Sequence, residues 1–230
     1  MNRFYQFVKK ELQGWKKTEI IGLAFIFAVV IFNSIVLNDS KIAAISAICG
    51  LMYTIIAGKG KISCYLFGLT GSGFYSYLAF VNGLFGNMML YLCYYVPMQI
   101  IGIFKWKKNL KKETNEIYKT KLPAKERILL SIISVLISAI SVLILIHFND
   151  THPYFDGIAT ALSLVGMYLT VKRCIEQWLV WGGVNLLSLI MWISVIKDGS
   201  RTYSTVFMWS VYLFLSVYFY REWLKEIKSE

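Results

Sequence analysis

Charged side chains are scarce in this sequence, and none lies in the interior of an apolar segment. Asp, Glu, Lys and Arg make up 16% of the 230 residues, and apolar residues make up 57%. A soluble domain carries about 25% charged residues, so the balance excludes a sizeable soluble domain and predicts an all-α integral membrane protein. Coupling to protons or ions usually requires ionisable groups within the membrane. The scarcity therefore also argues against an ion-driven pump.

Cysteine and histidine are too few and too scattered to form a metal or catalytic site. The four cysteines, Cys49, Cys64, Cys93 and Cys174, form no Cys-x-x-Cys pair, which argues against a zinc site or a disulfide framework. The two histidines fall near a segment end and in a loop, and no nucleophile–base pair or phosphate-binding loop is present. We therefore expect neither an enzyme nor a bound metal or cofactor.

Basic residues are the charge that is present, and they give the chain a net charge of +11. They gather at the ends of eight apolar segments, each long enough to cross a membrane as a helix. The segments are 18–37, 41–57, 62–81, 85–104, 127–148, 155–171, 177–196 and 202–220. With both termini in the cytoplasm, 21 of the 24 Lys and Arg residues lie on the inner side, as the positive-inside rule requires. The charge thus predicts a multi-pass plasma-membrane protein in contact with the lipid bilayer, not a nucleic-acid-binding protein.

The eight segments form two similar groups of three, separated by a basic loop and a linker helix. The predicted parts are an N-terminal amphipathic stretch with an extra span (1–40), a first three-helix bundle (41–104), a basic cytoplasmic loop (105–126), a linker helix (127–148) and a second three-helix bundle (155–221). A shift of 114 residues gives a weak similarity between the groups and sets Gly71 against Asn185. An odd number of spans from one group to the other makes the two bundles parallel, which is a recurring transporter plan.

The segment from Glu176 to Trp192 carries the motif that most directly indicates a function. Trp178, Trp181 and Asn185 are spaced at i, i+3 and i+7, which places them on one face of a helix. An Asn amide that faces lipid is costly, so we expect this face to point toward protein or a water-filled cavity. Two indole rings and an uncharged amide suit a flat, polar organic molecule that is neutral or cationic.

A second polar stripe occupies the fourth apolar segment. Asn87, Tyr91, Tyr95 and Gln99 recur about every four residues, and Pro97 should bend that helix or free a backbone carbonyl. Gln99 lies about 8 Å from the inner end of its helix, which is the same depth as the second tryptophan of the Trp-x-x-Trp motif. We therefore expect the two to share one site.

Aromatic and amide residues in membrane spans also have a plainer interpretation, because they often fill or hold together helix interfaces. For the joint pattern we favour a binding site, with Tyr212 as a weaker candidate for lining its cavity. Trp15, Trp106 and Trp223 fall at predicted cytoplasmic boundaries, and we interpret them as anchors at the membrane surface.

The sequence resembles the PnuC vitamin transporters over about residues 41–223. The Trp-x-x-Trp-x-x-x-Asn pattern of that family stands here as Trp178, Trp181 and Asn185, with further likeness in the run 61–68 and in the run 99–102. The resemblance implies the 3+1+3 arrangement of the SWEET sugar transporters, with the span at 18–37 added outside the seven-helix core. This chain departs from the family at Gly71, where some relatives have Asn.

The resemblance further implies facilitated diffusion of nicotinamide riboside, a vitamin B3 form used in NAD biosynthesis, by alternating access and with trapping by a cytoplasmic kinase. Trp178 or Trp181 would hold the pyridinium ring through a cation–π contact. Gln99 and Asn185 would bond the carboxamide and the ribose hydroxyls.

Two alternatives stay open at this point. The cargo would be another vitamin in the first, either thiamine, which is also a flat cation, or riboflavin, which is larger and uncharged. In the second, the chain would be a structural or partner-binding membrane subunit with no transport path. A homo-oligomer is compatible with all of these readings.

Overall fold

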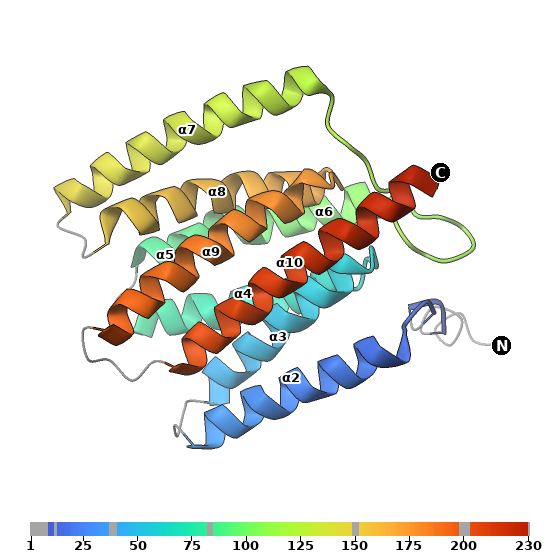
Figure 1. Ribbon diagram of the computed structural model, residues 1–230, viewed down its shortest axis with the longest axis horizontal. Helices are drawn as coiled ribbons and strands as arrows, with labels where there is room; N and C mark the ends of the chain where they lie inside the picture. Colours follow the sequence, from blue (N-terminus) through green and yellow to red (C-terminus); the bar gives the residue numbers. More distant parts are fainter. Residues whose placement is uncertain are drawn as a thin grey trace. The chain divides into compact units, whose positions relative to one another are not determined.

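The computed structural model describes residues 9–11, 13–36, 41–81, 85–148, 152–197 and 203–229, which form helices joined by turns and one long loop (Figure 1). No named strand occurs within these ranges. Internal contacts divide the chain into two compact units, Met1–Tyr118 and Lys119–Glu230. We refer to them as unit 1 and unit 2.

Unit 1 is arranged around one central helix. Its elements are α2 (Lys17–Val36), α3 (Lys41–Gly58), α4 (Cys64–Val81), α5 (Phe85–Leu90), the π-helical turn η1 (Tyr91–Tyr95) and α6 (Val96–Lys107). Helix α4 packs against α3 and against the α5–η1–α6 segment, while α2 packs against α3. Most of the buried residues of α4 are small, among them Gly68, Gly71, Ser72 and Ser76. Small residues let helix backbones approach closely, as in membrane helix bundles.

Unit 2 repeats this order of packing. Its helices are α7 (Ala124–His147), α8 (Pro153–Val171), α9 (Glu176–Lys197) and α10 (Tyr203–Ser229). Helix α8 packs against both α7 and α9, and α9 also packs against α10 (Figure 1). A glycine lets α7 and α8 approach, since a Cβ atom at Gly157 would lie 2.8 Å from the backbone nitrogen of Val142.

Several of the described helices have the length and composition of membrane spans. Three described runs are long and apolar enough to cross a membrane, namely Met88–Lys107, Ala124–His147 and Pro153–Val171. Helix α7 has no buried residue, and its leucine and isoleucine side chains are largely exposed. Such a surface is stable in contact with acyl chains rather than water.

The fourth apolar segment contains a local change of helix type just before Pro97. Over Tyr91–Tyr95 the chain forms a π-helical turn, and the backbone N–H of Val96 donates to the carbonyl of Tyr91. Proline has no backbone N–H and crowds the preceding turn, and a π-turn is one way a helix accommodates an irregular hydrogen-bond ladder. The expected irregularity at Pro97 therefore takes the form of a wider turn that carries three tyrosines.

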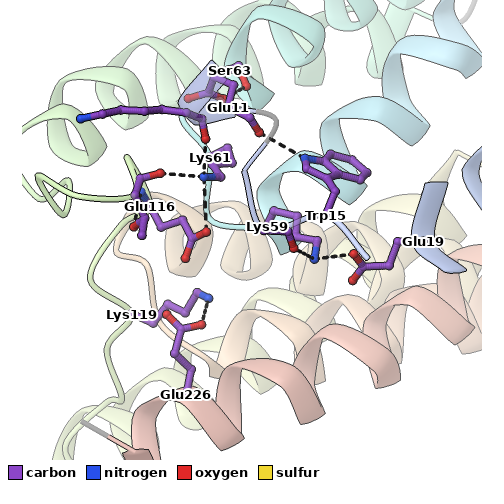
Figure 2. A network of polar contacts seen from close by, with 12 residues as sticks. Glu11, Trp15, Glu19, Lys59, Lys61, Ser63, Glu116, Lys119 and Glu226 are labelled. Carbon is purple, nitrogen blue, oxygen red and sulfur yellow. Dashed lines mark hydrogen bonds and ion pairs between the residues drawn. The ribbon is translucent and has the colours of Figure 1, made fainter. Parts of the chain in front are cut away.

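A buried lysine joins three segments in the loops of unit 1. The side chain of Lys61, in the turn between α3 and α4, is 1% exposed. Its ammonium group donates to the carbonyls of Lys10 (2.9 Å) and Thr114 (2.7 Å) and lies 3.3 Å from the Glu116 carboxylate (Figure 2). A buried charge is tolerated only when it is paired and hydrogen-bonded, so this lysine fixes the N-terminal segment and the long loop to the turn.

Further contacts hold the N-terminal segment at the same turn. The Ser63 hydroxyl donates to the Glu11 carboxylate (Figure 2). The Lys59 ammonium group pairs with the Glu19 carboxylate at 2.6 Å, and it lies 5.8 Å from the centre of the Trp15 ring. Trp15 in turn donates its indole N–H to the backbone carbonyl of Glu11. Contacts from the described residues that precede α2 thus tie them to the α3–α4 turn.

The prediction that Trp106 and Trp223 anchor the membrane surface is wrong. Both side chains are fully buried, at 0% exposure. Trp106 packs edge-on against Tyr65 at 5.0 Å, and Trp223 packs edge-on against Trp178 at 5.6 Å. Each indole packs against an aromatic ring in the first turn of a neighbouring helix. Burial against these aromatic partners outweighs any preference of the indole rings for the membrane interface.

Candidate functional site

The motif of α9 begins at a turn that the long loop holds in place. Thr120 exchanges backbone hydrogen bonds with this turn, donating to the carbonyl of Arg173 and accepting from the N–H of Ile175, both at 2.9 Å. The carboxylate of Glu176, in the first turn of α9, accepts from the backbone N–H of Leu122 and from Arg127. A carboxylate there also suits the positive end of the helix dipole. These contacts fix where α9 starts and therefore where its motif residues point.

Beside this turn, Lys172 carries a charge-assisted contact. Its ammonium group donates to Glu126 at 2.9 Å and lies 5.2 Å from the centre of the Tyr168 ring. The hydrogen bond to Glu126 raises the pKa of Lys172 above its ordinary value. The lysine therefore stays charged and paired at the end of α8.

Trp181 lies against α8, with its indole N–H already bonded. The N–H donates to the Thr170 hydroxyl at 3.1 Å, and that hydroxyl donates to the carbonyl of Gly166 at 2.9 Å. The ring packs over Gly166, where an added Cβ atom would lie 3.0 Å from it. Because the N–H is used within the protein, the half-buried ring has only its π-electron face to offer a ligand.

Asn185, one turn further along α9, is held by α10. Its amide NH₂ donates to the Ser216 hydroxyl at 2.9 Å, and that hydroxyl donates to the carbonyl of Tyr212 at 2.9 Å. Asn185 is 7% exposed and Ser216 is 2% exposed, so the bond is shielded from solvent. The amide is therefore turned toward protein, as the cost of an Asn in lipid requires, and Tyr212 contributes its backbone carbonyl.

Trp178, the first indole of the motif, is packed deeper than Trp181. It is 4% exposed, and its ring lies 5.2 Å from that of Phe219 and 5.6 Å from that of Trp223. Its indole N–H is buried and has no hydrogen-bond partner in the described part of the chain. An unpaired buried donor is costly, so this group is available to a ligand or water that reaches it.

Gln99 occupies a similar environment in unit 1. Its amide NH₂ donates to the Ser72 hydroxyl at 3.0 Å, and its carbonyl oxygen is buried without a partner among the described residues. That oxygen lies beside Gly68, where a Cβ atom would be 3.1 Å from it and 2.8 Å from the Tyr53 ring. Gln99 is 4% exposed, so it presents an acceptor in a protected setting.

The π-turn gathers the tyrosines of the second stripe. Tyr91 and Tyr95 pack edge-on at 4.7 Å, and Tyr91 lies 4.3 Å from the ring of Tyr75 on α4. Asn87 belongs to α5, but its side chain lies outside the described part of the structure. Within unit 1 the stripe therefore includes an aromatic cluster and a buried amide on the same segment.

The family described as nicotinamide mononucleotide transporter matches residues 40–225. The nicotinamide riboside transporter PnuC of Neisseria mucosa is 33% identical over 226 residues, which cover 96% of this chain and 86% of that protein. The corresponding protein of Haemophilus influenzae is 32% identical over 219 residues and covers 94% of each chain.

The chain belongs to the PnuC transporter family. A crystal structure of the vitamin B3 transporter PnuC superposes with a TM-score of 0.82 at 32% identity, covering 97% of this chain and 98% of that one. Like other PnuC family members, the chain is a multi-pass membrane protein. Its described residues contain no group of three or more His, Cys, Asp or Glu side chains that would hold a metal ion.

The sequence alone did not identify the hydroxyl groups that accept hydrogen bonds from the predicted site residues of this PnuC family member. Thr170, Ser216 and Ser72 each accept a hydrogen bond from one of the predicted site residues. A signal for the two serines was present in the spacing, since Ser72 follows Tyr65 by seven residues just as Asn185 follows Trp178. The spacing recurs in the last helix of each unit, in the pairs Gln99–Trp106 on α6 and Ser216–Trp223 on α10.

Proposed function

We propose that this chain carries nicotinamide riboside across the plasma membrane by facilitated diffusion with alternating access. The observation that carries the proposal is the polarity of the motif on α9. The N–H of Trp181 and one N–H of the Asn185 amide are bonded to hydroxyl groups of the protein, which leaves the ring face of Trp181 and the amide oxygen of Asn185 as acceptors for a ligand. These groups attract a cationic ring and hydrogen-bond donors. Nicotinamide riboside supplies a pyridinium ring, a carboxamide NH₂ and ribose hydroxyls.

The substrate-binding residues that we propose are those of the two predicted stripes. In unit 2 the ring of Trp181 holds the pyridinium ring, and the amide oxygen of Asn185 accepts a hydrogen bond from the substrate. Trp178 and Tyr212 line the same site. In unit 1, Gln99 supplies a second acceptor, and its stripe adds aromatic surface from Tyr91 and Tyr95 and an amide from Asn87.

The proposed architecture has eight spans, with both termini in the cytoplasm. It consists of the N-terminal span, two parallel three-helix bundles and a linker helix, in the 3+1+3 plan of the SWEET transporters. The concentration of Lys and Arg on one predicted side supports this orientation. Rocking of the two bundles would open the site to each side in turn.

The riboside is a better cargo than the mononucleotide named in the family description. Lys and Arg residues lie at the segment ends, and several are engaged by glutamates, as in the pairs Lys61–Glu116, Arg127–Glu176 and Lys172–Glu126. A phosphate group would therefore enter the spans without a cationic partner, which is costly. The same cost supports trapping, because a substrate phosphorylated by a cytoplasmic kinase would not leave again. The chain itself performs no covalent step.

The test is uptake of labelled nicotinamide riboside by purified protein in liposomes. We expect Trp181→Ala and Asn185→Ala each to reduce uptake roughly tenfold or more, since each removes a direct contact. Leu179→Ala is the matched control on α9, because Leu179 is 55% exposed. If both site variants transport normally at normal protein levels, the proposal is wrong and a structural role gains support.

Competition experiments in the same liposomes separate the remaining possibilities. Unlabelled nicotinamide riboside should compete strongly, the mononucleotide weakly, and thiamine or riboflavin less than the riboside. At a clamped membrane potential, a protonophore should leave net entry unchanged, because the proposed mechanism is passive. Stronger competition by thiamine would reassign the cargo without changing the site.

A further inference from the structure

Two buried hydroxyl groups accept hydrogen bonds from the side chains of the α9 motif. We propose that Thr170 and Ser216 are positioning residues that make this site accept hydrogen-bond donors and reject carboxylate analogues of the substrate. This inference rests on the proposed function and assigns its selectivity to two residues outside the motif. Neither residue needs to touch the substrate.

The orientation of Asn185 follows from the single proton of the Ser216 hydroxyl. That proton is donated to the Tyr212 carbonyl, one helical turn earlier on α10. The oxygen of Ser216 can then only accept, so Asn185 must present its NH₂ to it, at 2.9 Å. The amide oxygen of Asn185 is consequently directed away from Ser216. If the amide turned over, two acceptors would face each other in a buried position, or the Ser216 hydroxyl would have to give up its bond to the Tyr212 carbonyl.

Thr170 acts on Trp181 by the same chemistry. Its hydroxyl proton is donated to the Gly166 carbonyl, one turn earlier on α8, and its oxygen accepts the indole N–H. Thr170 is 1% exposed, so water does not compete for this bond. The bond fixes the plane of the ring against α8 and removes the N–H as a possible donor to a ligand.

The two bonds together occupy the N–H of Trp181 and one N–H of the Asn185 amide, and they direct an acceptor oxygen and an electron-rich ring face toward a ligand. The remaining indole N–H of the motif, on Trp178, is buried in the aromatic packing with Phe219 and Trp223. Nicotinamide riboside and nicotinic acid riboside share the pyridinium ring and the ribose. They differ in one group, since the carboxamide has an NH₂ to donate whereas the carboxylate has only acceptor oxygens. Because the acceptor oxygen and the ring face attract a donor and a cation, a site of this polarity favours the amide over the acid.

The experiment compares Thr170→Val and Ser216→Ala with two matched controls. In Thr54→Val and Ser134→Ala, a hydroxyl that donates to the carbonyl one turn earlier is also lost, from Gly50 and Leu130 respectively. No hydrogen bond from a side chain to either control hydroxyl is found in the described part of the chain. Uptake of both ribosides is measured in liposomes, as Michaelis constant and maximal rate.

We expect both site variants to raise the Michaelis constant for nicotinamide riboside about fivefold to tenfold, the usual effect of one lost hydrogen bond, with little change in maximal rate. Ser216→Ala should also reduce the preference for the amide over the acid, because the Asn185 amide is then free to turn. Thr170→Ser keeps the hydroxyl and should restore the wild-type constant. The controls should behave as the wild type does.

A spectroscopic measurement tests the geometry independently of transport. In protein labelled with ¹⁵N-tryptophan, the indole N–H signal assigned to Trp181 should shift in Thr170→Val but not in Thr54→Val. A shifted signal with unchanged kinetics and selectivity would overturn the positioning role. If the wild type itself fails to carry nicotinamide riboside, the proposed function fails instead, and an unshifted signal would show that the Thr170 bond is absent.

Discussion

The indole face of Trp181 is available in its present position because residue 166 is a glycine. The ring packs on the backbone of α8, and a Cβ atom at position 166 would lie 3.0 Å from one ring carbon and 3.2 Å from another. The ring has little freedom to yield, because its N–H is bonded to Thr170. Close packing of this kind leaves no room for an added methyl group.

Gly166→Ala should therefore displace the Trp181 ring and impair transport. Overpacking of a tight interface costs about 1–3 kcal/mol of stability, and the misplaced ring should raise the Michaelis constant for nicotinamide riboside about tenfold. Gly22→Ala in α2 and Gly73→Ala in α4 are the controls, since an added Cβ atom at either would meet nothing within 4 Å. Uptake and thermal unfolding in detergent provide the measurements. Equal behaviour of all three variants would show that the ring is not held at this position.

At the residue scale, sequence periodicity was enough to find the motif but not its partners. The spacing of Trp178, Trp181 and Asn185 indicates one helix face, and a polar face in an apolar helix indicates contact with protein. Thr170 carries no such signal, because a hydroxyl that bonds the carbonyl one turn earlier is compatible with any helix environment. Ser216 has only its seven-residue spacing from Trp223, which does not identify its partner. Which hydroxyl meets which motif residue depends on how the helices pack.

At the element scale, the segment before α2 is bound through a carboxylate that is poorly solvated. Glu11 accepts from Ser63, while its other oxygen is buried without a partner among the described residues. Burial raises the pKa of Glu11 above its ordinary value, although the hydrogen bond from Ser63 and the charge of Lys61 act in the opposite direction. The docked segment thus binds a proton more tightly than the released segment does.

The docking of this segment should weaken as pH rises. Between the ordinary and the raised pKa of Glu11, the docked form is protonated and the released form is ionised, so each step up in pH favours release. The protection of backbone amides 9–11 and 13–16, relative to their intrinsic exchange rates at each pH, should fall over that interval. In Glu11→Gln the dependence should disappear, and protection at neutral pH should be about threefold to tenfold higher. Glu113→Gln, at an exposed loop position, is the control, and a pH response that persists in Glu11→Gln would assign it to another group.

The α5–η1–α6 segment shows what could not be predicted for an element. Pro97 indicates an irregularity, and its sequence context does not say whether the helix bends, breaks or widens. The structure forms a π-turn over Tyr91–Tyr95, so the aromatic rings of the stripe are not spaced as in an ideal helix. By contrast, the bounds of a regular helix such as α7 (Ala124–His147) lie within three residues of the predicted 127–148, because charge and apolarity change sharply at both ends.

At the scale of the whole molecule, the two units contain the same kinds of interaction, but the two partners of an interaction lie on exchanged helices. Gly60 and Arg173 both have positive φ, 68° and 62°, and they lie 113 residues apart in equivalent turns. The shift is thus 113 residues rather than the expected 114. An aromatic ring packs on a glycine in each unit, but the ring belongs to α3 in one (Tyr53) and to α9 in the other (Trp181).

The amide–hydroxyl pair is exchanged in the same way. In unit 1 the serine is on α4 and the amide on α6, whereas in unit 2 the amide is on α9 and the serine on α10. A sequence comparison that scores identical residues at equivalent positions misses such exchanges, because the interaction is kept and the residues are not. This is why the internal similarity is weak in the sequence and clear in the contacts.

Exchanging the pair in unit 2 should therefore separate stability from transport. Asn185→Ser and Ser216→Asn each break a buried hydrogen bond or crowd its site, at a cost of about 1–3 kcal/mol. The double variant restores an amide–hydroxyl bond with its partners reversed, as in unit 1, so most of the lost stability should return in a double-mutant cycle of thermal unfolding. Uptake of nicotinamide riboside should stay at least tenfold low in the double variant, because the acceptor oxygen now projects from α10 rather than from α9. Recovery of both stability and uptake would mean that the amide serves packing alone.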